Sequence, residues 1–264
     1  MNETEIRKKL VNLSEEYNYS LKYQVEVMGK QIDVPVKYSD ASALTLFFPV
    51  SIDKTKEILN SKRLNPVAIT PNKCLLAITF FNYHDSAVGH YHEFTFSVPV
   101  LVDSKFTCPI LPIIFDSFFP NFGYNVILIG ADTEISRAHI EKIFPYPAFK
   151  KDISIILDEN DNKITASIKD KTGEVISVNL SVPNNYNFSK EKYNTYCTEN
   201  EKVFRVQLNA FLYWEKIVKM NNFKINLGNH EISKIFRKLN MAPKPISGVY
   251  YKKAIEIASE PKEI

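Results

Sequence analysis

Runs rich in valine, isoleucine, phenylalanine and threonine recur along almost the whole chain, and they limit its fold more than any other feature of the sequence. Within residues 91–102 the side chains alternate with a period of two, as they do in a strand whose faces differ. Phe94 and Phe96 fall on one face, and Thr95 and Ser97 fall on the other. A largely antiparallel β protein is therefore expected, with strands at 42–50, 74–83, 91–102, 108–115, 124–129, 152–157, 162–168, 174–182, 202–213 and 222–227.

Helical periodicity is limited to a few segments, namely 3–17, 52–61, 132–144, 229–239 and the start of the tail near 252–258. In the third of these, Asp132 or Thr133 can cap the helix, and Pro145 and Pro147 prevent its continuation. We expect these helices to lie around a sheet. Residues 158–162 are typical of a turn and residues 183–200 of a long polar loop. No linker divides the chain, so residues 1–264 are expected to form a single domain.

Charge and hydropathy argue against two classes of partner. The 33 basic and 30 acidic residues give a net charge of +3 without a dense basic face, so no nucleic-acid partner is expected. The longest apolar stretches, such as 43–50, are too short to span a bilayer, and the polar amino terminus lacks the apolar region of a signal peptide. We therefore expect a cytoplasmic protein with no membrane partner.

The three cysteines, Cys74, Cys108 and Cys197, are widely separated and never form a C-x-x-C pair. This spacing favours reduced thiols over a disulfide framework or a zinc site. Because Cys74 and Cys108 lie in apolar runs, both are expected in the core.

Several segments resemble acetoacetate decarboxylase, and they occur in the family's order. The most specific is Gly89-His-Tyr-His-Glu-Phe-Thr-Phe-Ser-Val-Pro-Val100, which is similar to the family's Gly-x-Tyr-x-Glu strand. Residues 44–59 and 75–83 resemble the strand, helix and strand that precede this motif. Residues 143–153 resemble the family's helix, Gly-Tyr/Phe-Pro-Lys-Lys and strand segment, and residues 246–251 resemble its end. The chain thus resembles the acetoacetate decarboxylase-like superfamily over nearly its whole length.

This resemblance implies an α+β fold. Its sheet would be antiparallel, strongly curved and cone-like or barrel-like, with helices at its periphery and an apolar pocket at its centre. It also implies assembly into a homo-oligomer.

The chain departs from the family at the residues that carry its chemistry. The position of the Schiff-base lysine falls on Ala148, and that of the neighbouring lysine falls on Phe149. The family's Gly-Arg-Glu becomes Ile140–Lys142. Its substrate-binding arginine falls near Ala41, and its second pocket carboxylate falls near Thr79.

Decarboxylation of a β-keto acid needs an electron sink, which a lysine imine supplies in this family. Ala148 cannot form an imine. Lys150 and Lys151 are the nearest amines, and a bulge in the chain could carry one of them into the pocket, although exposure beside a strand is the ordinary finding for lysine.

Glu93 matches the glutamate of the family's motif, and the resemblance makes it the candidate general acid or base. Apolar walls around such a carboxylate would raise its pKa toward neutrality. The alternative is a glutamate that only accepts hydrogen bonds from neighbouring strands. Candidate substrate contacts from the resemblance are Tyr91, Tyr146, Ala148, Phe149 and Thr79. Of the nearby aromatic residues in 80–96, most are expected in the core and some against a ligand.

Three histidines, His84, His90 and His92, lie near Glu93 in the sequence and raise the question of a metal site. On a strand, His90 and His92 share one face and Glu93 points to the other. Histidines spaced in this way are more often half-exposed packing residues than ligands. No metal and no other cofactor is therefore expected.

Three functions remain open. The first is a diverged enzyme, a lyase by resemblance, that acts on a small keto acid or related carbonyl compound without a lysine imine. The second is a non-catalytic member that binds a small apolar acid or pigment-like molecule. The third is a true β-keto acid decarboxylase in which Lys150 or Lys151 replaces the missing lysine. Each implies a small organic acid or carbonyl ligand.

Overall fold

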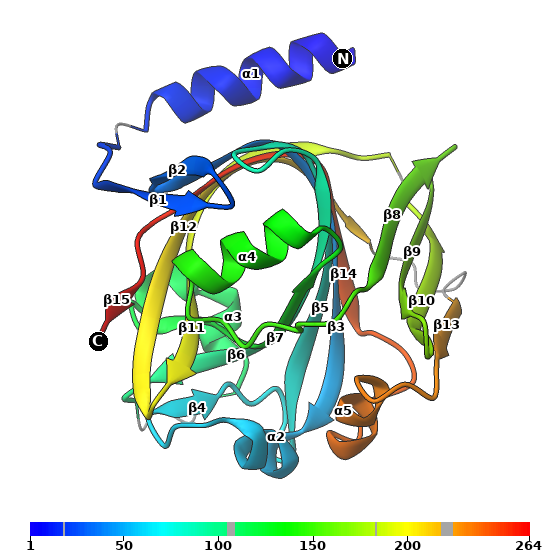
Figure 1. Cartoon of the computed structure of the whole chain (residues 1–264). Coiled ribbons are helices and arrows are strands. Elements are labelled where there is room, and N and C mark those ends of the chain that lie inside the picture. The colour runs from blue at the N-terminus through cyan, green and yellow to red at the C-terminus, as the bar shows by residue number, and fades with distance from the viewer. Residues whose placement is uncertain (18, 105–108, 183, 218–223) are drawn as a thin grey trace.

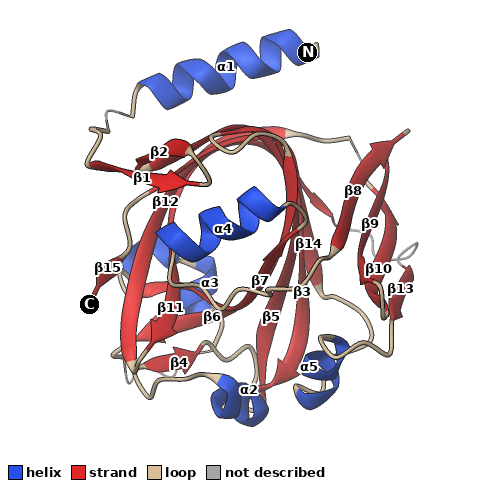
Figure 2. Cartoon of the chain, in the orientation of Figure 1, coloured by secondary structure: helices blue, strands red, loops and turns tan. Residues whose placement is uncertain are grey.

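Seven strands close on themselves into a barrel in the computed structural model, which describes residues 1–17, 19–104, 109–182, 184–217 and 224–264 (Figures 1 and 2). The hydrogen-bonded order is β11, β7, β6, β5, β3, β14 and β12, and β12 pairs back with β11. Neighbours are antiparallel except β7 and β11, which are parallel. The barrel strands are β3 (Val36–Ser51), β5 (Lys73–Ser86), β6 (Tyr91–Val102), β7 (Phe122–Ala131), β11 (Asn187–Glu199), β12 (Lys202–Ile217) and β14 (Ser247–Ala258).

The period-two alternation of β6 sorts its side chains between two environments. Phe94 and Phe96 point out of the barrel into a core that also contains Ile155 and Ile168 of a second sheet. Thr95 and Ser97 point to the barrel interior. The apolar face is therefore covered by a second layer, and the more polar face surrounds an internal space.

The second sheet has the order β13, β10, β9 and β8 and lies against the outer face of the barrel (Figure 1). Its strands are β8 (Ser154–Asn160), β9 (Lys163–Asp170), β10 (Gly173–Ser181) and β13 (Lys224–Leu227). Three small pieces complete the strands: the hairpin of β1 (Tyr23–Val27) and β2 (Lys30–Val34), the strand β4 (Leu64–Pro66) beside β6, and β15 (Lys262–Glu263) beside β12.

The helices lie around the strands, as expected. Their bounds are α1 (Glu3–Glu15), α2 (Ile52–Ile58), α3 (Leu111–Ile114), the 3-10 turn η1 (Asp116–Phe118), α4 (Glu134–Ile143) and α5 (Ser233–Lys238). Asn2 and Glu5 form a capping box at the start of α1, whose Ile6 and Leu10 pack on Phe211 of β12. Thr133 caps α4 through the backbone N–H of Ser136, which confirms one of the two predicted caps.

Helix α4 lies within the arch of barrel strands in Figures 1 and 2. Its Ile140, together with the following Phe144, faces the internal space. The helix therefore closes one side of the barrel interior.

Three sequence-based assignments are wrong. Residues 109–115 contain α3 instead of a strand, because Pro109 and Pro112 lack the N–H that a strand ladder needs and proline suits the first turn of a helix. Residue 108 lies outside the described residues. Residues 252–258 continue β14, where register shifts between Tyr251 and Glu256 break the alternation that identifies a strand. Residues 187–199 form β11 instead of a loop.

The strand β11 is polar because it is only partly buried, with exposed and half-buried side chains along most of its length. It nevertheless pairs with β12 over its full length and with β7, so it closes the barrel. No helix in the described part of the chain is long and apolar enough to cross a membrane. Cys74 and Cys197 are buried free thiols, and Cys108 lies outside the described residues.

Candidate functional site

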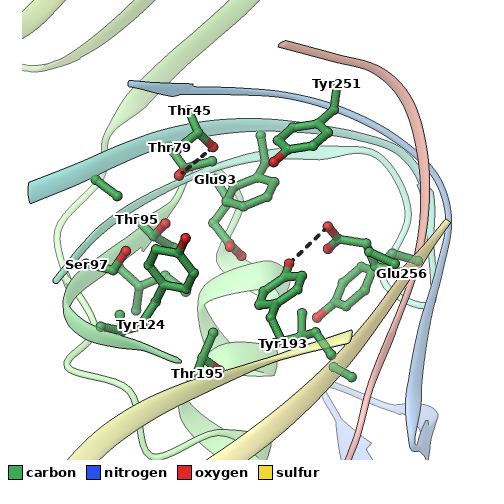
Figure 3. Close-up of a pocket in the computed structure, with 18 of the residues that line it drawn as sticks. Thr45, Thr79, Glu93, Thr95, Ser97, Tyr124, Tyr193, Thr195, Tyr251 and Glu256 are labelled. Carbon is green, nitrogen blue, oxygen red and sulfur yellow. Dashed lines mark hydrogen bonds between the residues drawn. The ribbon is translucent and has the colours of Figure 1, made fainter. Parts of the chain in front are cut away.

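The barrel surrounds a cavity of about 190 Å³ whose lining is rich in hydroxyl groups (Figure 3). Each of the seven barrel strands contributes to the lining, and so does α4. The lining tyrosines are Tyr38, Tyr83, Tyr124, Tyr146, Tyr193 and Tyr251. Smaller hydroxyls come from Thr45, Thr79, Thr95, Ser97 and Thr195. An empty cavity of this size accommodates a molecule somewhat larger than benzene.

Glu93 faces this cavity from β6, as the alternation of that strand predicts (Figure 3). The residue is only 5% exposed, and the hydroxyl of Tyr91 donates to its Oε2 over 3.4 Å. Burial, and after it the negative charge of Glu256, raises the pKa of Glu93 to about 8. Its carboxyl group is therefore largely protonated at neutral pH.

Glu256 of β14 is a second carboxylate in the same cavity, and the sequence did not single it out. It is 6% exposed, and the hydroxyl of Tyr193 donates to its Oε1 over 3.5 Å (Figure 3). Burial raises the pKa of Glu256 to about 7. Its signal in the sequence is a lone acid between Ile255 and Ile257, which indicates burial only once the segment is recognised as a strand.

The hydroxyl groups are partly linked to one another. The Oγ1 atoms of Thr45 and Thr79 lie 3.0 Å apart on the neighbouring strands β3 and β5. The Tyr146 hydroxyl lies 2.6 Å from Oγ1 of Thr195. Thr79 and Tyr146, both expected to contact a ligand, therefore lie in the lining.

The three other expected ligand contacts lie outside the lining. Tyr91 is fully buried beside Glu93, to which its hydroxyl donates, and its ring packs on the lining residue Tyr83 with centroids 4.8 Å apart. Ala148 forms an isolated β-bridge with Ile129 and packs against the cluster of buried residues that includes Ile129. Phe149 packs instead against the core between the barrel and the second sheet. The cause is the irregular chain after α4, where strand or helix periodicity cannot specify which side chains face inward.

Lys150 and Lys151 are both at the surface. Their side chains are 78% and 64% exposed and approach Glu141 and Glu231, respectively. Neither belongs to the cavity lining. The idea that a bulge carries one of these amines into the pocket is not supported by their placement.

The rings of the three histidines lie side by side, with centroids 6.3 Å apart for His84 and His90 and 5.0 Å apart for His90 and His92, but each ring also has a polar partner of its own. His84 Nε2 lies 3.2 Å from the Ser42 hydroxyl, and His90 Nε2 lies 3.0 Å from the side-chain oxygen of Asn82. His92 pairs with Asp132, as the alternation of β6 away from Glu93 requires. Among the described residues, no group of three or more histidine, cysteine, aspartate or glutamate side chains could hold a metal ion.

A different histidine lies next to the cavity. His139 of α4 is almost fully buried, and its Nε2 lies 3.2 Å from the hydroxyl of Tyr38, which belongs to the lining. Burial lowers the pKa of His139 to about 4, so its ring is neutral at physiological pH. The helical pattern of residues 132–144 gave no reason to separate this histidine from ordinary packing residues.

Comparison of the whole structure with solved structures finds the same fold in several proteins. An acetoacetate decarboxylase from Legionella pneumophila superposes with a TM-score of 0.62 at 12% identity, covering 96% of this chain and 94% of that one. A second acetoacetate decarboxylase gives a TM-score of 0.60 at 13% identity, covering 87% and 89% of the two chains. This chain has the acetoacetate decarboxylase-like fold. The barrel and the elements around it are therefore arranged as the sequence resemblance implied.

Two further solved structures match with somewhat lower scores. An acetoacetate decarboxylase-like enzyme from Sphingomonas wittichii gives a TM-score of 0.54 at 12% identity, covering 91% of this chain and 97% of that one. An enduracididine biosynthesis enzyme in complex with pyruvate gives 0.54 at 9% identity, covering 87% and 90%. Neither protein-family models nor curated protein sequences match this sequence.

The carboxyl groups of the described cavity lining come from four residues. Besides Glu93 and Glu256, the described lining contains Asp116 and Glu191, which are exposed and therefore lie where the cavity opens. The described lining contains no lysine, arginine, histidine or cysteine. It can thus exchange protons through carboxyl groups and donate hydrogen bonds through hydroxyls, but it offers no amine or thiol nucleophile.

Proposed function

We propose that this chain is a diverged enzyme in which Glu93 and Glu256 move protons on a small carbonyl compound without a lysine imine. The observation that carries the proposal is the placement of both carboxyl groups in one cavity, with pKa values raised to about 8 and about 7. Carboxyl groups with pKa values near the working pH are suited to general acid and base catalysis.

The two pKa values suggest a division of roles. Glu93, the more protonated group, donates a hydrogen bond to the carbonyl oxygen, as a neutral buried carboxylic acid can at pH 7. Glu256, the more ionised group, accepts a proton from the carbon next to the carbonyl. The electron pair of the broken C–H bond forms the C=C bond of an enol while the carbonyl oxygen takes the proton of Glu93. In the reverse step Glu256 returns a proton to carbon and Glu93 regains its own, and deuterium enters the product when the carboxyl proton of Glu256 has first exchanged with heavy water.

The surrounding hydroxyls support this reaction by orienting the substrate. Tyr193 donates to Glu256 and Tyr91 donates to Glu93, so each carboxyl group is held by one tyrosine. Each has a second oxygen with no hydrogen bond to the described protein, and that oxygen is available to a substrate. The family's decarboxylation is not proposed, because no described lining residue can form an imine.

A keto acid fits the cavity less well than an uncharged carbonyl compound. Its carboxylate would lie among acidic side chains with no basic group in the described lining to compensate its charge. The second candidate function is binding without catalysis, which the lack of an amine or thiol nucleophile in that lining favours. Assembly into a homo-oligomer and location in the cytoplasm stay predictions.

Exchange of the carbon-bound protons of small ketones for deuterium separates the two candidates. We expect the wild-type protein to accelerate exchange for at least one of acetone, butanone and hydroxyacetone in heavy water, followed by proton NMR. Glu93→Gln and Glu256→Gln should each slow exchange by about 100-fold or more. Glu57→Gln is the matched control, because Glu57 is an exposed glutamate of α2 paired with Lys54. Ketones that bind but exchange no faster than in buffer would favour the non-catalytic function.

A further inference from the structure

The carboxyl groups around the cavity face no basic side chain in the described lining. Glu93 and Glu256 lie inside, Asp116 and Glu191 lie at the opening, and no basic side chain belongs to the described lining. Lys253 of β14 binds Asp40 and Glu3. An anionic occupant would therefore meet only negative charge, whereas a cation would be attracted along the whole path from opening to interior.

Aromatic rings occupy the space between the outer and inner acids. The rings of Tyr124 and Tyr193 are perpendicular, with an interplanar angle of 88° and centroids 6.4 Å apart. Tyr251 also faces the cavity, from its upper wall in Figure 3. Rings at right angles present a face and an edge to one space, and the faces of tyrosine attract organic cations.

The carboxyl groups of Glu93 and Glu256 are a separate reason to expect a bound molecule that donates a hydrogen bond or carries a positive charge. Glu93 and Glu256 are both more than nine-tenths buried, and each has only one oxygen that accepts a hydrogen bond from the described protein. Both carboxyl groups line the cavity, as Figure 3 shows. A buried carboxyl group is stabilised when its second oxygen meets a donor or a positive charge.

We infer that the occupant of this cavity carries a positive charge, as a protonated amine or a quaternary ammonium group, and has no free carboxylate. The inference rests on the proposed function, since it concerns the same cavity, and it adds the charge class of the substrate. Such a cation lies against the faces of Tyr124, Tyr193 and Tyr251 and neutralises ionised Glu256. A carbonyl group in the same molecule then reaches Glu93.

Three probes of nearly equal shape and different charge test this inference on the wild-type protein. Choline is the cation, 3,3-dimethylbutan-1-ol is its neutral carbon analogue, and 3,3-dimethylbutanoate is the anion. Affinities are measured by titration calorimetry at low ionic strength, where charge effects are least screened. Choline is expected to bind about tenfold more tightly than the alcohol, as a cation over aromatic faces and a carboxylate should. The anion is expected to bind weakest.

Substitutions identify the side chain that is responsible for the preference for choline. Glu256→Gln should reduce the affinity for choline and leave that for the alcohol unchanged, while the control Glu57→Gln changes neither. Equal binding of choline and the alcohol, tighter binding of the anion, or no binding of any probe would overturn the inference. The ketone exchange assay keeps the two proposals apart: exchange without a preference for choline refutes only the charge class, and a preference for choline without exchange refutes only the catalytic function.

Discussion

Glu93 and Glu256 point into one cavity from β6 and β14, although β5 and β3 separate these strands in the order of the barrel. Closure of the barrel brings the two side chains close enough for the charge of Glu256 to raise the pKa of Glu93. The pair is therefore a product of barrel curvature, and a flat sheet with the same strand order would hold the two carboxyl groups apart.

The raised pKa values of this pair predict a dependence of stability on pH. In the unfolded chain both glutamates ionise near pH 4.3, whereas in the folded protein they keep their protons to about pH 8 and about pH 7. The folded state therefore binds more protons between these values, so the free energy of unfolding contributed by the pair falls as pH rises from about 4.5 to 8. The neighbours that face them are Tyr38, Tyr83, Tyr91 and Tyr193, whose own pKa values are raised.

Urea unfolding at pH 5 and pH 8 measures this effect. The loss of stability between the two pH values should be smaller in the variant with both Glu93→Gln and Glu256→Gln, by on the order of 2–4 kcal/mol. The matched control carries Glu57→Gln, which alters an exposed carboxylate. An equal loss in wild type and the double variant would mean that neither glutamate is perturbed in the folded state.

Because the two faces of β6 differ, substitutions at neighbouring positions should reduce the free energy of unfolding by very different amounts. Phe94→Ala removes a fully buried ring from the core between the barrel and the second sheet and should destabilise the protein by about 3–5 kcal/mol. Thr95→Val keeps the side chain about the same size and removes one hydroxyl from the cavity wall, so it should change the free energy of unfolding by less than about 1.5 kcal/mol, the worth of one hydrogen bond. Denaturant titration checks both. Similar losses at the two positions would contradict the assignment of faces.

The surface positions of Lys150 and Lys151 predict that no imine forms. After incubation with acetoacetate and borohydride, intact-mass measurement should find no stoichiometric adduct, because both amines are exposed and lie near Glu141 and Glu231. One adduct per chain, mapped to either residue and abolished by its change to alanine, would restore the decarboxylase hypothesis.

Much of the fold could be predicted from local patterns. The alternation around Phe94 and Phe96 identified a strand with one core face, and the Gly89-x-Tyr91-x-Glu93 motif placed its glutamate on the inner face. Helix α4 could be predicted from its capping residue and the prolines that follow it. These features depend on residues close in the sequence, which is why one sequence suffices for them.

The rest depends on contacts between distant segments. β11 is polar and resembles a loop, and only its pairing with β7 and β12 makes it a strand. Glu256 was missed because register shifts give its strand a helix-like spacing. Ala148 and Phe149 were placed by alignment to a family motif, and their contacts follow from how the irregular segment after α4 crosses β7. Periodicity carries no information about such crossings.

The central claim is that two carboxyl groups in the barrel interior are protonated near neutral pH, and carbon-13 NMR of glutamate labelled at its carboxyl carbon measures this directly. Two resonances should titrate far above the others, with midpoints near pH 8 and pH 7, and should disappear one at a time in Glu93→Gln and Glu256→Gln. Glu256→Gln should also lower the midpoint of Glu93, because it removes a neighbouring negative charge. If every glutamate of the folded protein titrates below about pH 5.5, the range usual for this side chain, the proposed proton-transfer pair does not exist.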